Sequence, residues 1–253
     1  MSPSERLEQS FSRAAETYDE VAFMQHLMAE RLAALVPVFS PGQQLQVLEL
    51  GCGTGVFTQM LLRQLSQCKV NLTLNDLSVP MLKECQYKLG SLSDCTFKAG
   101  DFRRLEFSGP YNLIAANCVL QWIPDLCMQF KRLAATLERK GVLLFSDFGR
   151  RHFQQIRELG HLGLDYLSKD ELLDALRQAG FTCTLHEELM DVAYPSVPDM
   201  LRVLKMSGVN GLSREIWTPR RLKAFCEEYA RKYSCQDGVY LSWDMRYVSA
   251  CLE

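Results

Sequence analysis

The sequence has no Cys-x-x-Cys pair among its ten cysteines, and its four histidines show no metal-ligand spacing. We therefore expect neither a zinc site nor a dithiol redox motif. No stretch reaches the ~18 uninterrupted apolar residues that a membrane span needs, and the polar residues 1–10 do not form the apolar segment of a signal peptide. These absences predict a protein of the reducing cytoplasm with no membrane partner.

An excess of one charge is also missing. The net charge of the 253 residues is −2, which provides no global electrostatic reason to bind nucleic acid or an anionic membrane. With 47% hydrophobic and 23% charged residues, the composition is that of an ordinary globular protein of one large domain. We expect no nucleic-acid partner, and an anionic partner would need a local basic patch.

The spacing of apolar residues predicts alternating helices and strands in the first 150 residues. Residues 5–36 carry apolar side chains at helical spacing up to Pro37. The strands expected after them are 46–50, 70–75, 95–99, 111–116 and 142–147, separated by helices at 56–65, 79–89 and 125–138. Strands that alternate with helices across short loops predict an α/β fold with a doubly wound, mostly parallel sheet.

The last hundred residues depart from this alternation of parallel strands and helices. Residues 239–250 alternate between apolar and polar types with a period of two, which indicates a long strand, antiparallel because no crossover helix follows it. The other expected elements are helices at 151–160, 168–179, 196–206 and 218–232 and a strand at 181–190.

The strongest local signal is the segment from Glu49 to Gly55, Glu-Leu-Gly-Cys-Gly-Thr-Gly, between the first strand and the next helix. Glycines at alternate positions let a backbone approach a ligand at the carboxyl end of a strand, where open sheets bind ligands. Val56 stands near where a dinucleotide fingerprint would have its third glycine, and the Gly-Lys-Ser/Thr of a phosphate loop is absent. A plain turn remains the alternative.

Polar residues follow the next three strands as well. Asp76 ends the second strand, where an acidic side chain can accept both hydroxyls of a ribose, although the residue also suits a helix cap. Asp101 and Phe102 follow the third strand, where a carboxylate and a backbone N–H could take the polar edges of adenine. Asn117 follows the fourth. Four consecutive strand ends of this kind indicate a nucleoside-binding edge.

These residues resemble the class I S-adenosylmethionine-dependent methyltransferases over about residues 44–148, which implies a Rossmann-like fold, S-adenosyl-L-methionine as donor and S-adenosyl-L-homocysteine as product. By this resemblance the glycine loop packs against the methionine part, Glu49 orients the amino group, Asp76 binds the ribose and Asp101 the adenine. The cofactor residues so implied are Glu49, Gly51, Cys52, Gly53, Gly55, Asp76, Leu77, Asp101, Phe102 and Asn117. Residues 44–62 contain no Lys or Arg, which suits a sulfonium better than a pyrophosphate.

The flanking segments resemble a narrower family, the malonyl-[acyl-carrier-protein] O-methyltransferases of early biotin synthesis. The segments that carry this resemblance are Phe11-Ser12-Arg13-Ala14-Ala15 with Tyr18, Asn117 to Trp122, Arg202 to Lys205 with Gly208, and Val239 to Cys251. It implies methyl transfer to the free carboxylate of a malonyl thioester on acyl carrier protein, or of malonyl-CoA. Asp147 departs from the family, which more often has a hydroxyl residue there.

If the resemblance holds, the acceptor is already ionised at neutral pH and needs no general base. We then expect positioning groups: Tyr18 over the donor, Gln121 and Trp122 near the transfer path. We expect an arginine to hold the carboxylate, and the candidates are Arg150, Arg151, Arg157 and Arg202. For each arginine a solvated helix face is the alternative.

The expected organisation is a single domain over residues 1–253. A helical lid occupies 1–43, a cofactor-binding core 44–148, and substrate-side helices with closing strands 149–253. A basic bias in the last of these, at Lys205, Arg214, Arg220, Arg221 and Lys223, would suit an acidic carrier protein.

Two other functions stay open. One is a class I methyltransferase that acts on another small acid or a quinone precursor. The other is a catalytically silent methyltransferase-like module. A nicotinamide dehydrogenase is disfavoured by Val56.

Overall fold

The computed structural model describes residues 2–90, 94–160, 164–208 and 218–253. Their centre is an eight-stranded sheet in the order β3-β2-β1-β4-β5-β8-β6, with β7 paired to β8. The strands are β1 (Gln44–Leu50), β2 (Lys69–Asp76), β3 (Cys95–Ala99), β4 (Tyr111–Asn117), β5 (Leu137–Phe148), β6 (Phe181–Tyr194), β7 (Ser234–Cys235) and β8 (Gly238–Leu252).

The first five strands are parallel, and the last three join antiparallel. Strand β8 lies between β5 and β6, and its pairing with β6 runs without interruption from Phe181–Leu252 to Tyr194–Val239. The predicted doubly wound sheet with an antiparallel C-terminal strand is therefore confirmed. The strand predicted at 181–190 continues to Tyr194 because this pairing continues.

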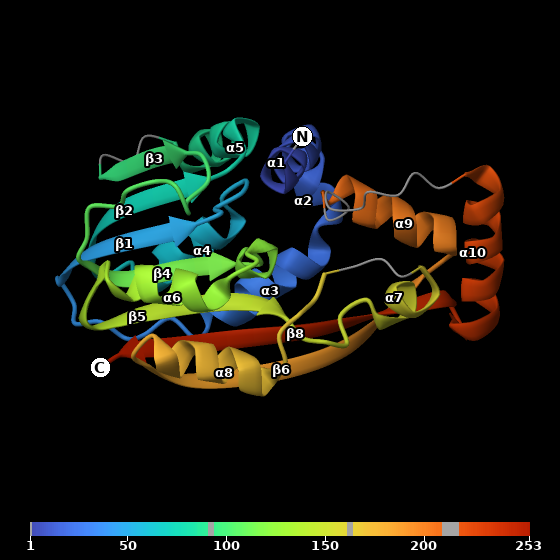
Figure 1. The fold of residues 1–253 in the computed structure, drawn as a ribbon. Coiled ribbons are helices and arrows are strands. Elements are labelled where there is room, and N and C mark those ends of the chain that lie inside the picture. Colours follow the sequence, from blue (N-terminus) through green and yellow to red (C-terminus); the bar gives the residue numbers. More distant parts are fainter. Residues whose placement is uncertain (1, 91–93, 161–163, 209–217) are drawn as a thin grey trace.

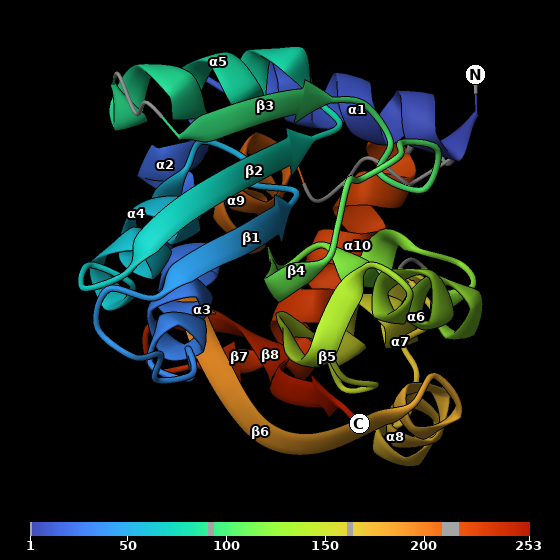
Figure 2. The same cartoon turned by 90° about the vertical axis from the view of Figure 1, so that its left-hand side faces the viewer.

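Successive side chains along a strand point to opposite faces of the sheet, and here apolar side chains form a core on each face. Val47 packs on one face and Leu48 on the other, and both are fully buried. Helices α3 (Phe23–Ala33), α4 (Val56–Gln64) and α5 (Val79–Leu89) cover the first face, and α6 (Leu126–Ala134) and α8 (Lys169–Gln178) the second. Figure 2 shows the two groups on opposite sides of the twisted strands. Each buried leucine contributes about 1.5–3 kcal/mol.

The segment 5–36, predicted to be helical up to Pro37, is mostly helical, but it forms three helices and not one continuous run: α1 (Pro3–Ala14), α2 (Tyr18–Val21) and α3. The reason is tertiary packing. Met24 and Met28 of α3 are buried in the core under the sheet, whereas Phe11 and Tyr18 pack with Met81 in a separate small cluster. One straight helix could not direct both sets to their partners, so the chain turns between Ala15 and Ala22.

A third group of helices lies beyond the carboxyl ends of the parallel strands: α7 (Gln154–Gly160), α9 (Val197–Met206) and α10 (Pro219–Lys232) (Figure 1). The helix predicted at 125–138 ends at Ala134, because the carbonyl of Thr136 already accepts a hydrogen bond from the Tyr111 amide and Leu137 pairs in the sheet. The helix predicted from 151 begins at Gln154.

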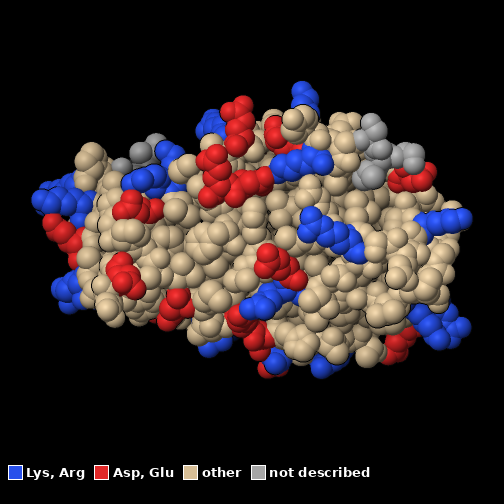
Figure 3. Space-filling view, turned by 180° about the vertical axis from the view of Figure 1, so that it is seen from behind, with Lys and Arg blue, Asp and Glu red and all other residues tan. Residues whose placement is uncertain are grey.

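The surface of the described residues has no single-sign region on the face that Figure 3 shows, where Lys and Arg are interspersed with Asp and Glu. Several cations of the C-terminal helices are paired locally, Arg202 with Asp199 and Lys223 with Glu227. Arg214 lies outside the described residues. No helix within the described ranges is both long enough and apolar enough to cross a membrane.

Candidate active site

The loop from β1 to α4 needs its glycines. Gly51, Gly53 and Gly55 all have positive φ, at 62°, 55° and 88°. A Cβ on Gly51 would stand 2.4 Å from Cγ2 of Val119, and one on Gly55 would stand 2.8 Å from Sγ of Cys85. At Gly51 and Gly55 only glycine fits both the backbone and the space, so the loop can lie close against Val119 and Cys85.

Asp76 fastens this loop to the next strand. Its Oδ2 accepts a hydrogen bond from the Gly53 amide, and its Oδ1 accepts one from the Ser78 amide, both at 2.8 Å. Burial raises the pKa of Asp76 to about 6. The cap of α5 is Ser78, whose side chain accepts from the Met81 amide, so Asp76 is not the capping residue of that helix.

Glu49 is a second buried carboxyl beneath the loop. It is 1% exposed, burial raises its pKa to about 8, and its Oε2 has no hydrogen-bond partner among the described residues. A buried polar atom without a partner is costly. A ligand that donates to Glu49 would therefore bind favourably.

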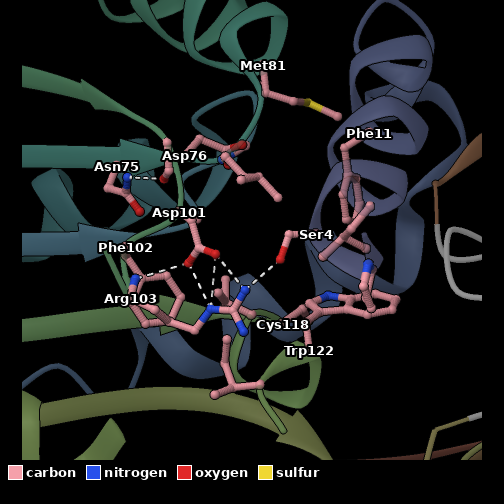
Figure 4. Close-up of a pocket in the computed structure, with 18 of the residues that line it drawn as sticks. Ser4, Phe11, Asn75, Asp76, Met81, Asp101, Phe102, Arg103, Cys118 and Trp122 are labelled. Carbon is pink, nitrogen blue, oxygen red and sulfur yellow. Dashed lines mark hydrogen bonds and ion pairs between the residues drawn. The ribbon is translucent and has the colours of Figure 1, made fainter. Parts of the chain in front are cut away.

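A cavity of about 340 Å³ opens where the parallel strands end. Nine of the residues that the sequence predicted line it: Tyr18, Gly51, Gly53, Asp76, Leu77, Asp101, Phe102, Asn117 and Trp122. Figure 4 shows Asp76, Asp101 and Phe102 at the strand ends on one side of the cavity and Phe11 of α1 on the other. Eight predicted residues do not line it: Glu49, Cys52, Gly55, Gln121, Arg150, Arg151, Arg157 and Arg202.

Arg103 also lines this cavity, although the sequence motifs did not predict it. Its Nε donates to Oδ1 of Asp101 at 2.8 Å, and its Nη2 donates to Oγ of Ser4 at 2.6 Å (Figure 4). Burial works to raise the pKa of Asp101, but the hydrogen bonds from Arg103 outweigh it, so that pKa lies below its ordinary value. An arginine two residues after a strand-end aspartate is the signal that could have revealed the pair.

The N-terminal helices close the outer side of the cavity. Ser4, Leu7 and Phe11 of α1 line it, and Oγ of Ser12 lies 2.8 Å from Oγ of Ser78. Asp19 of α2 accepts a hydrogen bond from the Thr54 hydroxyl at 2.6 Å and pairs with Lys88. These contacts tie α1 and α2 to the glycine loop and to α5.

Two further hollows adjoin the cavity, one small and one large. A small cavity of about 20 Å³, here called the neck, shares Phe11, Tyr18, Cys118 and Trp122 with the first cavity. The large hollow, about 890 Å³ and here called the groove, shares Gln121, Trp122, Phe148, Leu164 and Tyr166 with the neck. Trp122 lines all three, and the groove also shares Pro3, Ile123 and Pro124 with the first cavity, so cavity, neck and groove adjoin one another around Trp122.

A buried ion pair borders the groove. Arg246 of β8 donates to both oxygens of Asp147, at 2.9 and 2.6 Å, and to the carbonyl of Leu167 at 2.8 Å. Both side chains are 2% exposed. Burial raises the pKa of Asp147 against the opposing effect of Arg246. Asp147, which stands where the family more often has a hydroxyl residue, is thus paired with an arginine close to the C-terminal end of the chain.

The four candidate arginines lie elsewhere, and none lines the cavity, the neck or the groove. Arg150 pairs with Glu171 at 2.8 Å, Arg151 with Asp244 at 3.3 Å, and Arg202 with Asp199 at 2.6 Å. Arg157 donates to the carbonyl of Arg150.

Comparison with known proteins assigns the class. A family model described as "Methyltransferase domain" matches residues 22–186. The fold resembles the YcgJ protein from Bacillus subtilis, with a TM-score of 0.64 at 13% identity over 91% of this chain and 99% of that one. It also resembles an S-adenosylmethionine dependent methyltransferase from Mesorhizobium loti, with a TM-score of 0.54 at 17% identity over 88% and 97% of the two chains. The fold and the domain are those of a class I methyltransferase.

Sequence relatives narrow the class. The "Malonyl-[acyl-carrier protein] O-methyltransferase" of Bacteroides thetaiotaomicron is 34% identical over 95% of each chain. The protein of the same name from Porphyromonas gingivalis is 33% identical over 98% of this chain and 95% of its own, and that from Calditerrivibrio nitroreducens is 30% identical over 94% and 93%. This chain belongs to the malonyl-[acyl-carrier protein] O-methyltransferase family, as its flanking segments predicted.

Proposed function

We propose that this protein transfers a methyl group from S-adenosyl-L-methionine to the free carboxylate of a malonyl thioester on acyl carrier protein, early in biotin synthesis. The observation that carries the proposal is that cavity, neck and groove adjoin one another around Trp122, so that a donor-sized pocket borders an open groove. Family membership selects the acceptor, because relatives of similar length carry that name.

The residues around the cavity fit the donor. Its volume is in the range of small-molecule sites. Gly51 and Gly53 leave room for the methionine part. Glu49 does not itself line the cavity, but its buried Oε2, without a partner among the described residues and two positions before Gly51, would suit an ammonium group. The Asp76 carboxylate uses two of its four acceptor positions within the protein and keeps two for ribose hydroxyls. Asp101 and Phe102 line the adenine side that the resemblance implies.

The donor supplies an electrophilic methyl group: a carboxylate oxygen forms the new O–CH₃ bond while the S–CH₃ bond breaks and its electron pair returns to sulfur. The protein needs to move no proton. Phe11, Tyr18 and Trp122 are aromatic walls of the neck. Desolvation raises the pKa of Tyr18 far above its ordinary value, so its side chain stays a neutral phenol. Desolvation and alignment are the contributions left to the chain.

The direct test is to incubate the pure protein with methyl-labelled donor and malonyl, succinyl or acetyl acyl carrier protein. We expect labelled, base-labile methyl ester on the malonyl carrier and none on the acetyl carrier, which lacks a carboxylate. A quinone precursor or free acid methylated in preference to the carriers would favour the other enzyme. Donor binding without transfer to any acceptor would favour the silent module.

Removal of α1 is expected to harm activity far more than stability. Ala14 is the one fully buried residue of this helix, whereas Ser4, Leu7 and Phe11 face the cavity. Deletion of residues 2–14 should lower turnover by about a hundredfold or more, because water enters the neck. The melting temperature should fall by no more than about 5 °C. Scanning calorimetry beside the turnover assay checks both, and an unfolded product would show α1 to be part of the core.

Donor affinity is expected to rise with pH across the titration of Asp76. Its pKa of about 6 means that the carboxylate is mostly protonated at pH 5 and mostly ionised at pH 7. Ribose hydroxyls donate to the ionised form, so the association constant should increase about tenfold over that interval and level off above it. Calorimetric titration measures this.

Asp76→Asn is the control for that experiment, because an amide does not titrate and the slope between pH 5 and 7 should vanish. Glu49, with a pKa of about 8, contributes only at higher pH. An unchanged slope in Asp76→Asn would remove Asp76 from the ribose site.

A further inference from the structure

The neck contains a histidine that neither the sequence motifs nor the donor site accounts for. His152 is 1% exposed, lines the neck, and its Nδ1 has no hydrogen-bond partner among the described residues. Its ring is stacked between Phe148 and Phe153, with centroid separations of 3.8 and 3.7 Å. A polar atom held without a partner in an apolar site marks a place where a ligand can supply the missing bond.

The ring is rigidly placed and neutral. Tyr166 and Trp243 meet it edge-on, at 5.4 and 5.1 Å, so four aromatic rings fix its orientation. Burial lowers the pKa of His152 well below its ordinary value, and the charge of Arg157 lowers it further. A neutral imidazole carries one N–H, which makes His152 an uncharged hydrogen-bond donor in the neck.

An uncharged donor suits this reaction better than an arginine. The carboxylate is negative and the sulfonium positive before transfer, and both charges are lost as the methyl group moves. A guanidinium on the carboxylate would stabilise the reactants more than the transition state, which slows the chemical step. Among the described residues, no arginine lines the neck. Arg246, which lines the groove, is already neutralised by Asp147.

The volume of the neck agrees with an acceptor that inserts only its carboxylate. Its volume of about 20 Å³ is room for one water molecule or one oxygen atom rather than for a whole acyl chain. An acceptor that reaches in from the groove would therefore present one carboxylate oxygen to the donor side and keep its thioester among the groove residues.

We propose that His152 donates a hydrogen bond from its neutral ring to the acceptor carboxylate in the neck, and so selects acceptors that end in a carboxylate. This inference rests on the proposed carboxyl methyl transfer. It replaces the expected arginine by a neutral group that orients the nucleophile and costs little reactivity.

The test compares two probes, malonyl-CoA and acetyl-CoA, each titrated calorimetrically against protein saturated with S-adenosyl-L-homocysteine. His152→Phe keeps the stacking and removes the N–H. We expect it to weaken malonyl-CoA binding by about tenfold or more while acetyl-CoA and S-adenosyl-L-homocysteine bind within about twofold of the wild type. His152→Asn, which restores an N–H donor, should recover part of the malonyl preference. His186→Phe, on the exposed part of β6, is the matched control.

The outcomes separate the two proposals. If the wild type binds malonyl-CoA no better than acetyl-CoA, the carboxyl-transfer function fails and the role of His152 fails with it. If the wild type prefers malonyl-CoA and His152→Phe keeps that preference, or loses affinity for both probes equally, the inference about His152 is overturned and the function stands. The Asn variant tests the donor role separately. A folded His152→Asn protein without any preference for malonyl-CoA over acetyl-CoA overturns the inference too.

Discussion

An alanine at position 51 is expected to abolish measurable donor binding while the protein remains folded. The new Cβ would overlap Cγ2 of Val119 at 2.4 Å, and the residue would have to keep a φ of +62°. The backbone conformation alone costs about 1–2 kcal/mol for a residue with a Cβ, and relief of the overlap must move Val119 or the loop itself. Because both line the donor cavity, we expect the dissociation constant to rise by about a hundredfold or more.

Gly42→Ala is the matched control for Gly51→Ala. Gly42 has a φ of +78° but nothing within 4 Å of a built Cβ, so it carries the backbone cost without the overlap. Calorimetric titration should show normal donor affinity in this variant. Gly51→Ala combined with Val119→Ala should recover part of the loss. Normal affinity in the single Gly51→Ala variant would show that this loop is not the donor site.

The second large effect concerns the ion pair between Asp147 and Arg246. Arg246→Met would leave a buried carboxylate without its cation, and we expect the free energy of unfolding to fall by about 3–5 kcal/mol at pH 7.5. The double variant Asp147→Leu with Arg246→Met removes both charges and should regain most of that loss. Urea denaturation of the wild type, the two single variants and the double variant measures the coupling directly.

The pH dependence of the Arg246→Met variant has a defined sign. Without the arginine, burial raises the folded-state pKa of Asp147 further above the unfolded value, so the folded state takes up a proton more readily than the unfolded chain does. The stability lost by the substitution is therefore smaller at pH 5 than at pH 7.5. An equal loss at both values would mean that Asp147 is not left charged in the variant.

Local elements were predictable because their signals are local. The helix predicted at 79–89 is α5 as observed, since Ser78 caps it, Pro80 opens it and Gly90 follows it. The strand at 95–99 is likewise β3. The predicted strand ends converge on one cavity because parallel strands bring their carboxyl ends to one edge of the sheet.

The neck was predicted only in part. Tyr18, Gln121 and Trp122, which were expected near the transfer path, all line it. Its other walls come from distant segments that no periodicity joins: α1, α3, the end of β5, the turn at residues 149–153, the segment 164–166 and β8, beside η1 (Leu120–Trp122). The candidate arginines were chosen for their charge and for their place just after the fifth strand, and neither shows that Arg150 and Arg151 have carboxylate partners in the fold. Asp147 could be noticed as unusual, but its partner stands 99 residues away in the chain.

Because β8 is the last strand of the chain, the donor side and the acceptor side of the site can form at different times during synthesis. Strands β1 to β5, whose carboxyl ends form the strand side of the donor cavity, all precede β8 in the chain and so leave the ribosome before it. Trp243 and Arg246, which border the neck and the groove, arrive only with β8. A nascent chain can therefore acquire its donor pocket well before it has an acceptor groove, and methyl transfer waits for the final strand to enter the sheet between β5 and β6.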